Sequence, residues 1–227
     1  MKKEILKTSR VLLCAALVLT LLFPALAEEE LPEGMLAEEE ILTRLLDEAE
    51  RFAVSGEQDM WTAPDGTLFC SAPESDVNLM LRSEKSGAEM ENITGADLTD
   101  SPDARGLKTG DPLSAVLAAY PLEDPELKGS EYMAVMYLDG TAEEGYVRAG
   151  YLVREGDNVT ACVYTSFTFY DDGTVTETGV RYDICADTVD SITVYSREAD
   201  RDETLYLLDE LADCRGLTEF VPVMLTR

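Results

Sequence analysis

Residues 159–185 have the sequence VTACVYTSFTFYDDGTVTETGVRYDIC, and this stretch decides the fold class. Two runs rich in β-branched and aromatic residues flank Asp172-Gly173, a dipeptide that favours a two-residue type I′ hairpin turn. Such a turn places Val163 opposite Tyr182 and gathers apolar side chains on one face of the hairpin. The stretch therefore predicts two antiparallel strands with one buried face and one polar face.

The same alternating pattern extends on both sides of this hairpin. It predicts a meander of strands over residues 132–195, in which a turn at Ala186-Asp187-Thr188 sets Tyr182 opposite Ile192 and Val180 opposite Val194. Three shorter strands are predicted upstream, at residues 67–72, 77–83 and 88–95, and a closing edge strand at 220–225.

Helical periodicity appears in three places. Apolar residues recur on one stripe over residues 35–54, and a second amphipathic helix is predicted at 202–213 with Gly216 as its stop. Between them, Asp111 is expected to cap a short helix that has Pro112 in its first position and ends before Pro121. The fold class predicted is α+β, with an N-terminal helix, a mainly antiparallel sheet and short helices.

The first 27 residues are typical of a secretory signal peptide. Basic side chains at Lys2, Lys3, Lys7 and Arg10 precede an apolar run that ends in Ala25-Leu26-Ala27. Cleavage is expected between Ala27 and Glu28, because small residues precede that bond. The run is short for a membrane span, which needs about 20 apolar residues. We therefore expect a signal peptide at 1–27, an acidic leader at 28–34 and a single α+β domain at 35–227, secreted or facing the cell envelope and without a stable membrane span.

Charge and composition exclude several classes of function. The chain has 46 acidic residues, 18 basic residues and no histidine, so a Ser-His-Asp relay and a histidine metal site are excluded. Removal of residues 1–27 leaves 14 basic and 45 acidic side chains, a net charge of −31. Such a charge repels nucleic-acid phosphates and favours a soluble monomer. No cofactor is predicted.

Four cysteines remain after residue 27, an even number that suggests one or two disulfides in an exported protein. The predicted hairpin register places Cys162 and Cys185 diagonally, at about 7–8 Å, which is too far for an unstrained bridge. Any bridge is therefore expected to include Cys70 or Cys214. The alternative, four free thiols, stays open.

The segment from Arg105 to Pro121 resembles a module of uncharacterised exported proteins of Gram-positive bacteria. Its shared features are Gly106-x-x-x-Gly110-Asp111, Val116 and Tyr120-Pro121. The arrangement of a short helix before a sheet is also distantly similar to beta-lactamase-inhibitor-like and small outer-membrane-lipoprotein domains. The resemblance spans about residues 65–196 and implies a secreted or envelope-associated domain without established catalytic residues.

Two functions from different classes are consistent with the sequence. Tyr164 and Tyr170 are predicted on the polar face of the hairpin, where aromatic rings can stack on a sugar or peptide. This favours a non-catalytic domain that binds an extracellular protein or glycan. The alternative is a carboxylate-dependent hydrolase of extracellular glycans, although 45 acids supply adjacent pairs by chance and no catalytic residue is distinguished. The Asp-Gly pairs are explained by hairpin turns, so no metal site is predicted.

Overall fold

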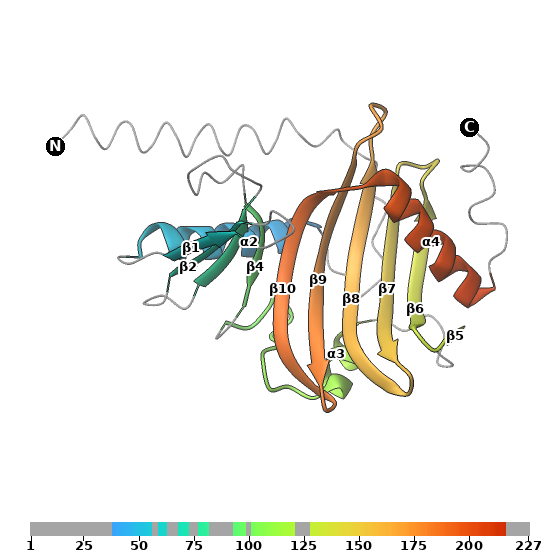
Figure 1. Cartoon of the computed structure of the whole chain (residues 1–227), viewed down its shortest axis with the longest axis horizontal. Coiled ribbons are helices and arrows are strands. Elements are labelled where there is room, and N and C mark those ends of the chain that lie inside the picture. Colours follow the sequence, from blue (N-terminus) through green and yellow to red (C-terminus); the bar gives the residue numbers. More distant parts are fainter. Residues whose placement is uncertain are drawn as a thin grey trace. The chain divides into compact units, whose positions relative to one another are not determined.

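An antiparallel sheet of ten strands organises the described part of the chain (Figure 1). The computed structural model describes residues 38–55, 59–62, 68–72, 77–81, 93–98, 101–120 and 128–216. The strand order is β1-β2-β3-β4-β10-β9-β8-β7-β6-β5. The strands are β1 (Asp59–Thr62), β2 (Leu68–Ala72), β3 (Val77–Leu81), β4 (Ile93–Asp97), β5 (Lys128–Gly129), β6 (Met133–Thr141), β7 (Tyr146–Glu155), β8 (Asn158–Phe169), β9 (Val175–Cys185) and β10 (Thr188–Ala199).

Three helices accompany the sheet: α2 (Glu38–Ala53), α3 (Leu113–Ala119) and α4 (Arg201–Arg215). Helix α2 contacts β3, β4, β9 and β10, and α4 contacts β5 and β6. Figure 1 shows α4 crossing one face of the sheet beside β6. The architecture confirms the predicted α+β class, with an N-terminal helix and an antiparallel sheet. The predicted signal peptide, leader and closing strand lie outside the described residues.

The two faces of the sheet belong to two separate cores. On one face of β8–β10, Tyr164, Tyr182 and Ile192 pack with α2 and α3 residues such as Phe52 and Val116. We call this the sealed face. On the other, residues of β6–β9 pack under α4, among them Val163 and Phe167 with Leu208 and Leu211. Because strand side chains alternate, each central strand contributes to both cores, so neither face of the predicted hairpin is simply polar.

The helix ends follow the local chemistry of the sequence. Asp200 caps α4, its side chain accepting hydrogen bonds from the backbone N–H groups of Asp202 and Glu203, and Gly216 closes it in the left-handed conformation at φ +73°. The predicted start of α3 is wrong by one position. Pro112 is the N-cap residue, and the Asp111 carboxylate accepts the N–H of Lys108 instead. Asp111 thus tightens the preceding loop.

The predicted register of the 159–185 hairpin is wrong by one residue. Val163 lies opposite Arg181, and Cys162 lies opposite Tyr182. The reason is the turn. The N–H of Gly173 donates to the carbonyl of Tyr170, and Gly173 has φ +92°, which gives a three-residue loop in place of a two-residue type I′ turn. One extra loop residue moves every side chain of one strand to a new partner.

The next hairpin has the predicted pairing. Ile192 lies opposite Tyr182 and Val194 opposite Val180. The turn itself is different: Ala186 and Asp187 both have positive φ, as in a two-residue type I′ turn, and the register shifts between Val189 and Ser191. The short turn and the bulge together give the register that a three-residue turn would give. Upstream, β2 and β3 lie within their predicted strands, and β4 extends to Asp97, two residues beyond the predicted end, while residues 88–92 of that predicted strand lie outside the described residues.

Candidate functional site

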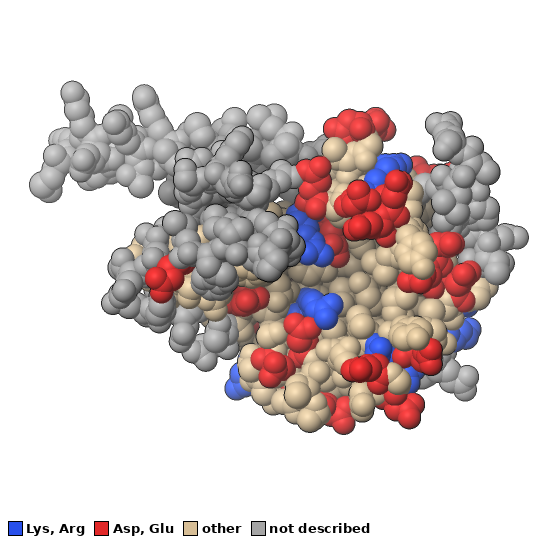
Figure 2. Space-filling view, in the orientation of Figure 1, with Lys and Arg blue, Asp and Glu red and all other residues tan. Residues whose placement is uncertain are grey.

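A band of polar side chains crosses the strands on the face opposite the sealed face. It is formed by the side of β4, β10 and β9 that α4 leaves uncovered, together with Thr165 of β8, and we call it the open face. Figure 2 shows this side of the molecule, where basic side chains lie among acidic ones beside a broad uncharged area. The open face comprises Asp97, Thr165, Glu177, Gly179, Arg181, Asp183, Ser191, Thr193, Tyr195 and Arg197.

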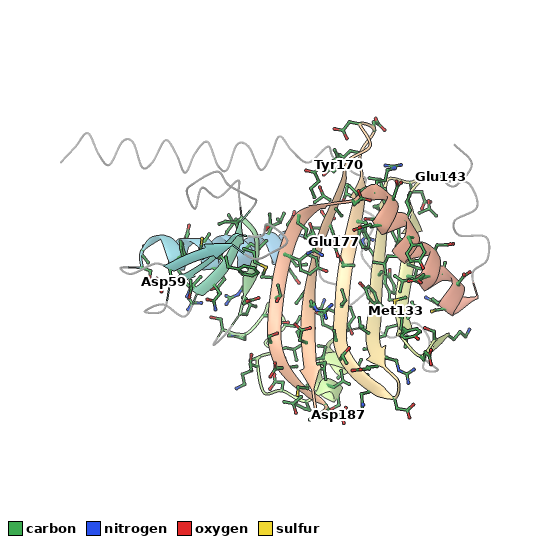
Figure 3. All side chains as sticks on the ribbon, viewed as in Figure 1. Asp59, Met133, Glu143, Tyr170, Glu177 and Asp187 are labelled. Atoms are coloured by element: carbon green, nitrogen blue, oxygen red, sulfur yellow. The ribbon has the colours of Figure 1, made fainter. Side chains whose placement is uncertain are left out.

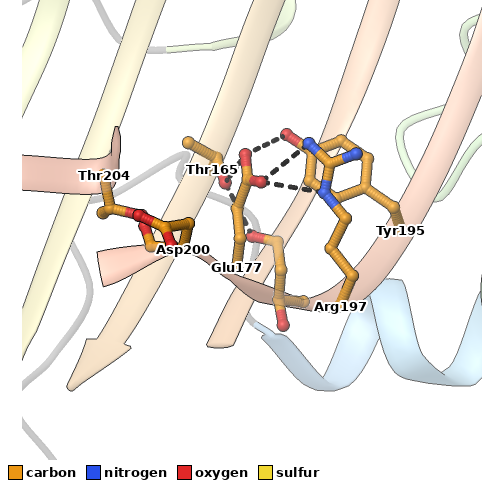
Figure 4. A network of polar contacts seen from close by, with 7 residues as sticks. Thr165, Glu177, Tyr195, Arg197, Asp200 and Thr204 are labelled. Carbon is orange, nitrogen blue, oxygen red and sulfur yellow. Dashed lines mark hydrogen bonds and ion pairs between the residues drawn. The ribbon is translucent and has the colours of Figure 1, made fainter. Parts of the chain in front are cut away.

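Glu177 is the centre of the first cluster on this face (Figures 3 and 4). Its side chain is 9% exposed, and one carboxylate oxygen accepts both Nε and Nη2 of Arg197, at 3.0 and 2.9 Å. The other oxygen accepts the hydroxyl of Tyr195 at 3.0 Å and that of Thr165 at 3.4 Å. The Arg197 guanidinium also lies 4.9 Å from the centre of the Tyr195 ring. Four donors therefore hold a buried carboxylate, which in turn orients an arginine whose side chain is 57% exposed.

Arg181 and Asp183 form the second cluster, on the same strand and face as Glu177. Nε of Arg181 donates to Asp183 at 2.8 Å, and the Ser191 hydroxyl donates to the other Asp183 oxygen at 3.0 Å. On the far side of β10, the hydroxyl of Thr193 donates to Asp97 at 2.8 Å. Asp97, Thr193 and Arg181 occupy one row of paired residues across β4, β10 and β9. This row presents a carboxylate, a hydroxyl group and a guanidinium on neighbouring strands.

The titration behaviour of the open face follows from partial burial. Desolvation raises the pKa of Asp97, the Thr193 hydrogen bond lowers it, and the nearby Asp183 raises it again. Burial and the Glu177 charge raise the pKa of Tyr195 well above its ordinary value. Burial likewise raises the pKa of the neighbouring Tyr151 to about 12. The tyrosine hydroxyls on this face therefore stay protonated at neutral pH, and Tyr195 can act as a donor to Glu177.

The placement of Tyr164 on an exposed binding face is wrong. Its side chain is 2% exposed and belongs to the sealed face, where its ring stacks on Tyr120 at 3.5 Å between centroids. Tyr170 is 44% exposed, but it lies in the loop beyond β8, at one end of the sheet. The two tyrosines do not share a surface, because the one-residue register shift sends Tyr164 into the core.

The sealed face holds a chain of hydroxyl groups that ends on a carboxylate. Tyr120 and Tyr182 share a hydrogen bond of 2.7 Å between their hydroxyls, and Tyr182 donates to Asp103. The other oxygen of Asp103 accepts the backbone N–H groups of Arg105 and Leu107, both at 2.8 Å. Burial is the main cause that raises the pKa of Tyr182 and of Tyr120. This cluster fastens the 101–112 loop to the sheet.

The Gly106-x-x-x-Gly110-Asp111 segment completes that attachment. Gly106 and Gly110 have φ values of +81° and +91°, which other residues adopt only with strain. The N–H of Gly110 donates to Val189 at 2.9 Å, and Val189 donates back to Asp111 at 2.8 Å. The segment thus shapes a docking loop for the β9–β10 turn, consistent with a structural role for its residues. The resemblance itself stays a prediction.

None of the cysteines at positions 70, 162, 185 and 214 is joined to another in the structure described, which agrees with the alternative of four free thiols and not with the disulfide that their even number suggested. Cys70 and Cys162 are buried in the sealed-face core, Cys185 is exposed at the end of β9, and Cys214 is partly buried on α4. Burial raises the pKa of the Cys162 thiol to about 12 and also raises that of Cys70. The two buried thiols are therefore protonated and unreactive in the folded protein.

Within the described ranges, no group of three or more Cys, Asp and Glu side chains is placed to hold a metal ion. Nor is any helix in that part of the chain both long enough and apolar enough to cross a membrane. Comparison of the sequence and structure with protein-family models, curated proteins and solved structures gives no match in any of the three. The functional assignment therefore rests on the site itself.

The sequence contains a pattern that predicts the open face, although the incorrect register of β8 with β9 placed the wrong β8 residues on it. Alternate positions on β9 carry Glu177, Gly179, Arg181 and Asp183, three charges and a glycine on one side of a strand. Charged side chains at alternate positions of a strand rarely face an apolar core, so their alternation predicts a polar face. The predicted pairing of β9 with β10 also gives their partners on β10, such as Arg197 opposite Glu177 and Thr193 opposite Arg181.

Proposed function

We propose that this protein is an exported, non-catalytic binding domain that meets an extracellular ligand through its open face. The observation that carries the proposal is the pair of arginines on that face. Arg181 and Arg197 are 43% and 57% exposed, yet each is held by a carboxylate that is itself fixed by hydroxyl groups of the sheet. Surface arginines without such support lose side-chain entropy when they bind, whereas these are already oriented.

Export is supported by the first 27 residues of the sequence. A basic start, an apolar run and the Ala25-Leu26-Ala27 ending favour cleavage before Glu28. N-terminal sequencing of protein recovered from the medium or envelope should begin at Glu28. Recovery of the full-length chain in the membrane fraction would show instead that the segment is an anchor.

Binding through the open face is tested with purified protein and extracellular envelope material from the producing cell. We expect the protein to sediment with this material, and Arg181→Ala and Arg197→Ala to weaken that association. Lys108→Ala is the matched control, because it removes the same charge from an exposed side chain of the 101–112 loop. Equal retention of all three variants would place the binding surface elsewhere, and no retention of the unaltered protein would argue against a binding function.

A hydrolase is the second candidate, and one observation favours it. Asp97 and Asp183 lie on either side of β10, and their environments differ, since Asp97 has a raised pKa whereas Asp183 is ion-paired with Arg181. Two carboxyl groups in unlike environments are the requirement for acid and base roles in glycoside hydrolysis. Release of new reducing ends from a glycan, abolished in both Asp97→Asn and Asp183→Asn, would establish the hydrolase. We expect no release.

A further inference from the structure

We draw no further inference here: the strongest candidate, the pair of carboxylates Asp97 and Asp183 on either side of β10 on the open face, belongs to the site already described, and no other feature of the described residues points to a ligand for them.

Discussion

Each face of the central sheet contains a tyrosine hydroxyl that donates to a carboxylate, but the two pairs have different surroundings. On the sealed face the Tyr182 hydroxyl donates to Asp103, and on the open face the Tyr195 hydroxyl donates to Glu177. Asp103 completes its hydrogen bonds with backbone N–H groups of its own loop, so the cluster ends within the core. Glu177 completes its hydrogen bonds with Arg197, which extends into solvent.

The difference shows that a buried carboxylate with a tyrosine partner does not by itself indicate a functional site. The two clusters differ in the group that completes the hydrogen bonds of the carboxylate. A backbone donor fixes a loop, whereas a half-exposed guanidinium keeps donors available to a ligand. The same comparison predicts that substitutions on the sealed face will mainly change stability and that substitutions on the open face will mainly change binding.

The largest effect is expected from Tyr164→Ala. This ring is stacked on Tyr120 and lies against Gly150, where a Cβ would come within 3.0 Å of it. Loss of a buried aromatic side chain costs about 3–5 kcal/mol, so the free energy of unfolding should fall by that amount. Tyr170→Ala, at the exposed loop, is the control and should change stability little. Urea denaturation measures both, and equal midpoints for the two variants would contradict the placement of Tyr164 in the core.

A smaller difference is expected between the two carboxylates. Asp103→Ala leaves the buried Leu107 N–H without its acceptor, whereas the Arg105 N–H is only part-buried and the Tyr182 hydroxyl keeps its hydrogen bond with Tyr120, so the cost is about 1–3 kcal/mol. Glu177→Gln keeps an acceptor for Tyr195 and loses an ion pair with a half-exposed arginine, about 1 kcal/mol. Thermal melting of both variants should show the larger loss for Asp103→Ala. The reverse order would mean that the open-face cluster is the structural one.

The sequence predicted the fold class and most elements because their signals are local. The apolar stripe of residues 35–54 yields α2, with Ile41, Leu45, Ala49 and Phe52 buried as expected, and Gly216 closes α4 as expected. The site was predictable only in part, because the predicted register of β9 with β10 pairs Glu177 with Arg197 correctly, whereas the predicted register of β8 with β9 is wrong. A single extra loop residue at Gly173 moved Tyr164 to the opposite face, and this choice between two turn types is not fixed by the Asp-Gly pair alone.

The tyrosines of both faces should make the protein sensitive to alkali. Burial raises the pKa of Tyr182 on the sealed face and of Tyr195 on the open face. A phenol with a raised folded pKa contributes stability that is fully present below the unfolded value of about 10 and is lost as pH rises above it. We expect the melting temperature to fall above about pH 10, and to fall less steeply in Tyr182→Phe. A constant melting temperature up to pH 12 would show that these hydroxyls ionise within the folded protein.

The smallest effect is expected at Asp97, and it should be favourable. The raised pKa of Asp97 means that the native state binds its proton more tightly, so the ionised form destabilises the fold at pH 7. Asp97→Asn keeps an acceptor for Thr193 and should raise stability by a few tenths of a kcal/mol. The gain should vanish once pH falls below the unfolded value of about 4, where the native carboxyl is protonated. Differential scanning calorimetry at pH 7 and 3.5 measures this, and a loss of stability at pH 7 would show that the carboxylate is needed in its charged form.

The pairing of β4 with β10 has a consequence for the order in which the chain folds. Asp97 and Thr193 are 96 positions apart, whereas β6 to β10 are joined through hairpins between neighbours in the sequence. Closing a long loop costs entropy before its contacts form, so the β6–β10 meander should assemble first and offer the edge of β10 to β4 afterwards. The docking of the 101–112 loop on the β9–β10 turn has the same requirement. Strands β1–β4 and helix α2 therefore find their places only after nearly the whole chain has been synthesised, so the first half of the chain stays without its partner strand during most of synthesis.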